Sequence, residues 1–320
     1  MFSIIGRLLK APVFVCMTIG SVFHFLAFTA YFGYVAKILE YSFAMIPSQA
    51  NIVAGVILST SSVIASTTSG LIDRWWPMTL RGMCRYNACM VFFITLLFPI
   101  FFALSCSAPE IKGMGAKGPE LACLNQTTCQ CSAFYRPICV DDVSYFSACH
   151  AGCTGLAGNN TAAAYSGCLC GNFTRATPGA CMQTCSQVYP FGCLLFLVLL
   201  LNGLSGVQYT KVCMSQTTPS TKPVALGTMT FVFQVVGMFV PSSLGRVIDT
   251  ACRLTQPGAD NCLVYDGLRM TRAINVIALV AIIPAFCFQT AAWYFSPRED
   301  IVKRTLANEP SEQTDLNSRT

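Results

Sequence analysis

The sequence predicts an all-α membrane protein of six transmembrane helices with one disulfide-rich extracellular loop, and three observations predict it. Only 11% of the residues are charged and 54% are hydrophobic, whereas a soluble domain carries about a quarter charged residues. The apolar residues form six stretches that each exceed the roughly 18 residues needed to cross a bilayer. Ten of the 19 cysteines and all three Asn-x-Thr sequons fall in the polar segment between the third and fourth stretches.

The six apolar stretches contain no Asp, Glu, Lys or Arg. The first is longer than the roughly 7 to 15 residues of a signal-peptide core and no small-residue cleavage site follows it, so we expect a retained helix. The second is rich in serine and threonine, which indicates close helix packing or, as the alternative, the lining of a polar path. The expected spans are 12–36, 51–72, 86–105, 188–210, 223–245 and 273–295.

The polar segment after the third span is expected to be extracellular. Disulfides and glycosylated sequons both belong to oxidising compartments, whereas zinc sites, the competing chemistry of clustered cysteines, belong to reducing ones. The sequons begin at Asn125, Asn159 and Asn172. An even number of spans then puts both termini in the cytoplasm. The cytoplasmic segments hold more lysines and arginines than the short outer connections do, as the positive-inside rule requires.

We expect the ten loop cysteines to pair among themselves, because their number is even. They are Cys123, Cys129, Cys131, Cys139, Cys149, Cys153, Cys168, Cys170, Cys181 and Cys185. A second external loop, 249–271, holds Cys252 and Cys262, which we expect to form one more disulfide. The membrane cysteines Cys16, Cys89, Cys193 and Cys287 are expected to be free.

A charged motif follows the second span at the cytoplasmic side. Gly70-Leu-Ile-Asp73-Arg74 is similar, with one residue fewer between the glycine and the aspartate, to the Gly-x-x-x-Asp-Arg loop motif of the major facilitator superfamily. In that superfamily the glycine permits close packing and the charged pair links neighbouring helix ends. The alternative interpretation is an ordinary charged membrane boundary.

The cysteine spacing of the loop resembles a known module. Cys131-Ser-Ala-Phe-Tyr-Arg-Pro-Ile-Cys139, followed by Tyr145 and Cys149-His-Ala-Gly-Cys153, resembles a Kazal domain. A Kazal module between membrane spans is characteristic of the organic anion transporting polypeptides. Lys37-Ile-Leu-Glu-Tyr-Ser-Phe and Gly245-Arg-Val-Ile-Asp-Thr-Ala-Cys252 are also similar to sequence of that family.

The resemblance runs over about residues 5–296 and implies half of a twelve-helix major facilitator fold. The chain would then supply helices seven to twelve, and a missing N-terminal six-helix half would be its partner. The implied domains are three helices over 1–106, a Kazal-like loop over 107–187, three helices over 188–296 and a disordered cytoplasmic tail over 297–320.

Five residues are candidates for contact with a substrate. His24, Phe28 and Phe32 recur at helical spacing and share one face of the first span, where a histidine that is simply packed in the bundle is the alternative. Lys37 matches a lysine frequent in the family, although a snorkelling lysine would occupy the same place. Gln234 stands where many family members carry an arginine, which implies that one positive element of the anion path is missing.

The resemblance implies sodium-independent secondary transport of large amphipathic organic anions across the plasma membrane, in the class of steroid conjugates, bile acids, prostanoids and thyroid hormones. The sequence contains only two histidines and no phosphate-binding glycine loop, so we expect no enzyme activity, no cofactor and no metal. Its positive residues are scattered, which argues against nucleic acid. The alternative is a truncated, non-transporting membrane protein whose Kazal-like ectodomain binds an extracellular partner.

Overall fold

The computed structural model describes most of the helical part of the chain and part of the extracellular loop. The described residues are 6, 9–106, 111–112, 114–115, 118–119, 136–141, 143–153, 155–157, 164–166, 177–179, 181, 185–217, 221–255 and 262–297. The expected sequons and tail, apart from residue 297, lie outside the described residues, as do Cys123, Cys129, Cys131, Cys168 and Cys170.

Within the described residues, six helical segments are long and apolar enough to cross a membrane, which confirms the predicted fold class. Most extend beyond their apolar stretches, because backbone hydrogen bonds continue into the polar boundary. The third is an α-helix continued by a 3₁₀ turn that begins next to Pro99. The helices are α2 (Pro12–Ser42), α3 (Pro47–Trp75), α4 (Leu80–Leu97) with η1 (Phe98–Phe102), α5 (Val188–Ser215), α6 (Lys222–Asp249) and α7 (Gly267–Phe295).

Local sequence explains where several helices begin. Pro12 and Pro47 occupy the first positions of α2 and α3, where proline loses no intrahelical hydrogen bond. The Thr79 hydroxyl caps α4 by accepting from the backbone N–H of Gly82 at 3.3 Å. The Asp266 carboxylate caps α7 by accepting from the N–H of Arg269 at 3.2 Å.

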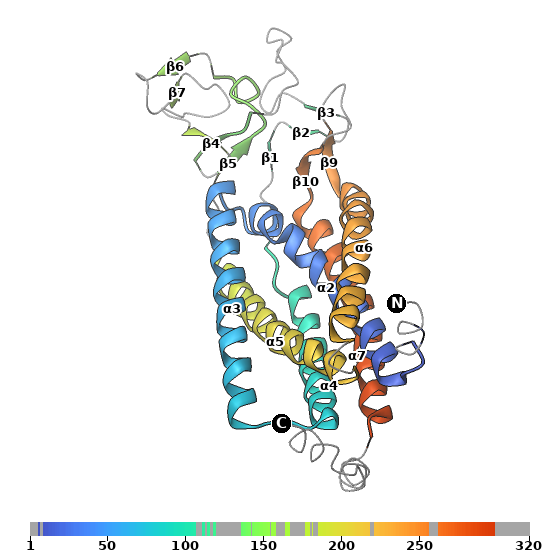
Figure 1. Cartoon of the computed structure of the whole chain (residues 1–320). Coiled ribbons are helices and arrows are strands. Elements are labelled where there is room, and N and C mark those ends of the chain that lie inside the picture. The colour runs from blue at the N-terminus through green and yellow to red at the C-terminus, as the bar shows by residue number, and fades with distance from the viewer. Residues whose placement is uncertain are drawn as a thin grey trace, which may run out of the picture.

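The bundle consists of tightly packed helix pairs (Figure 1). The helix α2 packs along α7, and α5 packs against both α3 and α4. The helix α3 buries only small residues, namely Ala50, Ala54, Ser61, Ala65 and Ser69. Because these residues are small, α5 approaches closely: a Cβ atom at Gly203 would lie 2.5 Å from the Ala65 Cβ.

Three exposed hydroxyls of α3 are satisfied within the helix. Ser59, Thr60 and Thr67 donate to the backbone carbonyls of Gly55, Val56 and Val63, at 2.5, 2.5 and 2.9 Å. Such bonds let serine and threonine face an apolar surrounding without losing a partner. The hydroxyl-rich sequence of this span therefore fits helix packing, and none of these hydroxyls lines the cavity described below.

The described strands gather at one end of the bundle, above the start of α3 and the end of α6 (Figure 1). Four of them form a sheet in the order β1-β5-β4-β8. The remaining strands pair as β2 with β3, β6 with β7, and β9 with β10. The strands are β1 (Ile111–Lys112), β2 (Met114–Gly115), β3 (Gly118–Pro119), β4 (Ile138–Val140), β5 (Val143–Tyr145), β6 (Gly155–Ala157), β7 (Ala164–Ser166), β8 (Thr177–Pro178), β9 (Cys252–Thr255) and β10 (Cys262–Tyr265).

The disulfides follow the expected pattern with one correction. Cys139 bonds Cys181 inside the loop and Cys252 bonds Cys262 across the β9–β10 hairpin. Cys185, however, bonds Cys106 with their Cα atoms 6.4 Å apart, so the expectation that 123–185 is closed on itself is wrong. The reason is geometric: η1 and α5 leave the membrane side by side, and this bond joins the two chain ends that carry the loop.

Candidate functional site

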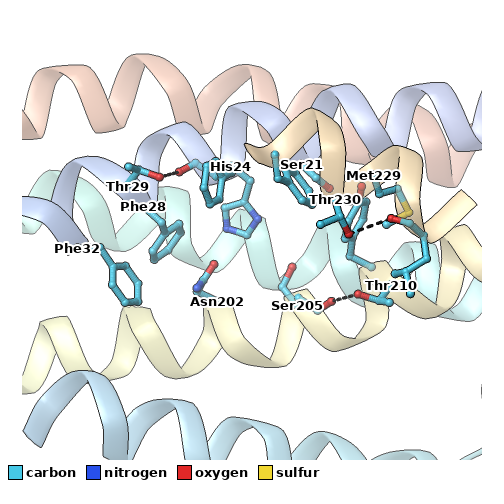
Figure 2. Close-up of a pocket in the computed structure, with 15 residues that line it drawn as sticks. Ser21, His24, Phe28, Thr29, Phe32, Asn202, Ser205, Thr210, Met229 and Thr230 are labelled. Carbon is cyan, nitrogen blue, oxygen red and sulfur yellow. Dashed lines mark hydrogen bonds between the residues drawn. The ribbon is translucent and has the colours of Figure 1, made fainter. Parts of the chain in front are cut away.

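A cavity of about 650 Å³ lies between α2, α5 and α6 (Figure 2). Ligand pockets for small molecules span roughly 300–1,000 Å³, so the volume suits one organic molecule. None of the fifteen lining residues is charged. They are Ser21, His24, Phe25, Phe28, Thr29 and Phe32 of α2, Asn202, Ser205, Gly206, Tyr209 and Thr210 of α5, and Leu226, Met229, Thr230 and Phe233 of α6.

The α2 wall contains the three residues that helical spacing groups together. His24, Phe28 and Phe32 all line the cavity, and the rings of His24 and Phe28 meet edge to face at 5.0 Å. His24 is 7% exposed, and its Nε2 has no hydrogen-bond partner among the described residues. Figure 2 shows the imidazole pointing across the cavity toward Asn202 and Ser205 of α5.

The serine and threonine hydroxyls of all three walls are already bonded. Thr29, Thr210 and Thr230 donate to backbone carbonyls one turn back in their own helices, at 2.8, 3.1 and 2.9 Å. Ser205 donates to the side chain of Asn87 on α4. The amide of Asn202 makes no hydrogen bond to any described residue. The imidazole of His24 and this amide, together with the buried hydroxyl of Tyr209, are therefore the polar groups best placed to bind a ligand.

Aromatic rings close the α6 side. Phe233 lies 5.4 Å from Phe25 and 5.9 Å from Tyr209, measured between ring centroids. Together with Phe28 and Phe32 they give the cavity a mainly apolar surface with a few polar points. Such a surface suits a molecule with a broad apolar body and a polar group, which is an amphipathic ligand.

Two predicted substrate residues lie elsewhere. The Lys37 Nζ lies 4.8 Å from the Tyr265 ring and 6.0 Å from the Tyr34 ring, at the outer end of α2. Gln234 is exposed on α6 and does not line the cavity. Both were chosen by matching family positions, and the structure brings neither to the cavity that holds His24.

Tyr265 connects Lys37 to α6. Its hydroxyl donates to the carboxylate of Asp249 at 2.9 Å, and its ring meets that of Tyr41 edge to face at 5.4 Å. Burial and the neighbouring Asp249 carboxylate raise the pKa of Tyr265 to about 12, so it remains a neutral donor at physiological pH. The outer ends of α2 and α6 are thus linked through one residue of the disulfide-closed hairpin.

The charged motif after the second span links α3 to α5. Asp73 forms an ion pair with Lys211 and accepts from the Gln208 amide at 2.8 Å. Arg74 and Gly70 are exposed, and no described atom lies within 4 Å of a Cβ placed on Gly70. Of the three motif residues, the aspartate therefore makes the interhelical contact in the described part of the chain.

Sequence reasoning missed the α5 wall. None of the predicted substrate residues lies on α5, but Asn202 lines the cavity together with Ser205, Tyr209 and Thr210. These residues recur at helical spacing, which is a signal that one face of the span is polar. Among the described residues, no group of three or more His, Cys, Asp or Glu side chains is close enough to hold a metal ion.

Comparison with known proteins gives consistent matches. Residues 1–270 match the profile of the Organic Anion Transporter Polypeptide (OATP) family. Human solute carrier organic anion transporter family member 6A1 is 25% identical over 97% of this chain and 47% of its own length. Human member 4C1 is 24% identical over 91% of this chain and 44% of its own length. Mouse member 4A1 is 26% identical over 99% of this chain and 47% of its own length. The chain spans about half the length of these relatives.

Proposed function

The chain belongs to the Organic Anion Transporter Polypeptide family, and on that premise we propose that it provides one half of a twelve-helix secondary transporter of large amphipathic organic anions. It is a multi-pass membrane protein whose family is one of transporters, not of enzymes. The proposed cargo is the class of steroid conjugates, bile acids, prostanoids and thyroid hormones, moved across the plasma membrane without sodium or ATP.

The observation that carries the proposal is the composition of the cavity. A steroid-like ring system fits the aromatic surface that α2 and α6 provide, while the His24 imidazole and the Asn202 amide offer hydrogen bonds to its polar end. The cavity lacks fixed charge, so binding there depends on apolar area and hydrogen bonds, and the positive residues lie outside it. Lys37 at the outer end is placed to attract anions toward the protein.

The proposal needs a second half to complete the site. In facilitator folds the substrate lies at the interface of two six-helix units, which rock about it. Here α2, α5 and α6 form the walls on one side. Large apolar residues of α6, such as Phe231, Met238 and Phe239, are exposed next to the cavity and provide a surface against which further helices could pack.

The disulfides support the proposed orientation. Cys106–Cys185 and Cys252–Cys262 lie at the strand-bearing end of the bundle, which supports an extracellular assignment for that end. Both termini are then cytoplasmic. Proteolysis of intact cells that cleaves a terminal tag without permeabilisation would contradict this orientation.

The test is uptake of a labelled steroid sulfate into vesicles that contain either this chain alone or this chain joined to the first six helices of a family member. We expect saturable uptake by the joined protein only. Saturable uptake by the chain alone would contradict the two-half argument, and no uptake by a folded joined protein would favour the non-transporting alternative.

Matched variants of the joined protein connect uptake to the cavity. Phe32→Ala should raise KM, whereas Phe93→Ala should not, because the two side chains are 51% and 50% exposed but only Phe32 lines the cavity. His24→Ala should act as Phe32→Ala does. Lys37→Ala should weaken uptake more than Lys37→Arg does, because the outer charge is what draws the anion.

A further inference from the structure

The end of α3, the connection that follows and the start of α4 (residues 74–85, here called the turn) concentrate arginine and tryptophan at the end of the bundle opposite the strands (Figure 1). Arg74, Trp75, Trp76, Arg81 and Arg85 fall within twelve residues. Trp75 and Trp76 are 65% and 68% exposed. Indole rings at the end of a membrane span lie at the level of the lipid headgroups, so this turn is placed at the membrane surface.

The positive charge of the turn is uncompensated within the described part of the chain. Asp73, the acidic residue closest in sequence, is already paired with Lys211. Arg74 and Arg85 are exposed and take part in none of the ion pairs found among the described residues. Arg81 donates to the backbone carbonyl of Ser296 at 3.3 Å, which holds its guanidinium at the end of α7.

The start of α4 adds to this positive field. The first turn of α4 contains no acidic residue, and the N-terminus of a helix carries a partial positive charge. Arg81 and Arg85 are four residues apart and therefore share one face of the helix. A negatively charged group at this place would meet guanidinium groups and a helix N-terminus together.

We propose that this turn binds the phosphate of an anionic lipid headgroup in the cytoplasmic leaflet, with Arg74 and Arg85 contacting the phosphate and the rings of Trp75 and Trp76 inserted beside it. The disulfides at the opposite end support a cytoplasmic position for this turn, and the cytoplasmic leaflet is the one that carries anionic lipids. A lipid is favoured over a soluble phosphate because two exposed indole rings lie next to the arginines in sequence. A lipid can contact these rings with its apolar part, whereas a soluble phosphate ion has no apolar part.

The protein contains its own reporter for this test. The sequence has three tryptophans; two are in the turn, and the third, Trp293, is partly buried near the end of α7 at the same end of the bundle. Bromine on a lipid chain quenches only nearby indoles. The full chain would be placed in phosphatidylcholine vesicles that contain an equal small fraction of either brominated phosphatidylserine or brominated phosphatidylcholine.

We expect clearly stronger quenching by the anionic lipid, since each arginine near an anionic surface corresponds to roughly fivefold local enrichment. If the two lipids quenched the unmodified chain equally, the proposal would be overturned. The R74Q/R85Q variant should lose the preference, whereas the R246Q/R272Q control, with the same net charge and exposed arginines at the outer end, should keep it. Loss in both variants, or in neither, would contradict the assignment.

One further arm separates the two sources of phosphate. An excess of inorganic phosphate should leave the preference for the anionic lipid in place, because the indole contacts belong to the lipid alone. If inorganic phosphate abolished the preference, the turn would be a general anion site and the lipid assignment would be wrong. The test does not use transport, so its failure leaves the proposed function untouched.

Discussion

The contact between α3 and α5 predicts a large effect from a single methyl group. In Gly203→Ala the new Cβ would lie 2.5 Å from the Ala65 Cβ, whereas carbon atoms in contact prefer about 3.5–4.0 Å. Both groups are attached directly to helix backbones, so neither can rotate away. The helices must separate locally by about 1 Å, and such overpacking typically costs about 1–3 kcal/mol.

The matched control is Gly206→Ala on the same helix. No described atom lies within 4 Å of a Cβ at Gly206, and alanine is otherwise the better helix former by about 1 kcal/mol. Gly206→Ala should therefore be neutral or stabilising. The double variant Ala65→Gly/Gly203→Ala should recover most of the stability that Gly203→Ala loses, since Ala65→Gly removes the methyl group that the new Cβ at position 203 would meet.

The assay is unfolding in mixed micelles titrated with SDS and followed by helical circular dichroism, for the wild type, the three variants and Ala65→Gly alone. The double-mutant cycle should give a coupling energy of about 1–3 kcal/mol between positions 65 and 203. If Gly203→Ala unfolded at the same SDS fraction as Gly206→Ala, the close approach of α5 to α3 would be refuted. A double variant that is no more stable than Gly203→Ala would refute it as well.

Three further predictions concern other contacts. Because the ion pair is partly exposed, Asp73→Asn and Lys211→Gln should each lower the free energy of unfolding by up to about 1 kcal/mol. The double variant should lose no more than either single variant, and fully additive losses in the same SDS assay would count against the ion pair. Since Cys106 bonds Cys185, nine cysteines remain between 123 and 181, which is an odd number. Mass mapping without reduction should therefore find one of them as a free thiol or bonded to another chain. Complete pairing within the segment would contradict the Cys106 bond. Burial lowers the pKa of His150 below its usual value of about 6.5, so below that pH the unfolded state binds more protons than the folded state. The melting temperature of the ectodomain should therefore fall as the pH drops below about 6.5. His150→Gln should flatten this pH dependence, and an unchanged slope would assign the pH dependence to another group.

The fold was predictable because a bilayer imposes strong constraints on sequence. Length and apolarity alone located six spans, and the described residues form six long helical segments at those places. The helix ends were less predictable. The helix α2 continues to Ser42 through Lys37 and Glu40, since apolarity marks the thickness of the bilayer while a helix ends where its backbone hydrogen bonds end.

The disulfide error has a similar origin. Cys106 directly follows an apolar stretch that ends at residue 105, so it was counted neither with the membrane cysteines nor with the loop. Pairing depends on the distance between Cα atoms, and that distance is set by how η1 and α5 emerge from the bundle. Cys252 and Cys262 were predictable because two cysteines in one short loop have few other partners.

The cavity was predictable on one wall. His24, Phe28 and Phe32 belong to one helix, where spacing alone determines which residues share a face. The contributions of Asn202 and Phe233 required knowledge of which distant helices meet. Lys37 and Gln234 were assigned by family position, and a position in an alignment does not determine whether a side chain faces the cavity.

The measurement that tests the central claim most directly is photocrosslinking of a photoreactive steroid sulfate to the joined protein, followed by mass mapping of the labelled peptides. The claim is that the organic anion binds between α2, α5 and α6. The account predicts labels within residues 21–32, 202–210 and 226–233 that disappear with excess unlabelled steroid sulfate. Labels confined to the outward faces of α3 or α4, or labels that excess ligand does not suppress, would contradict it.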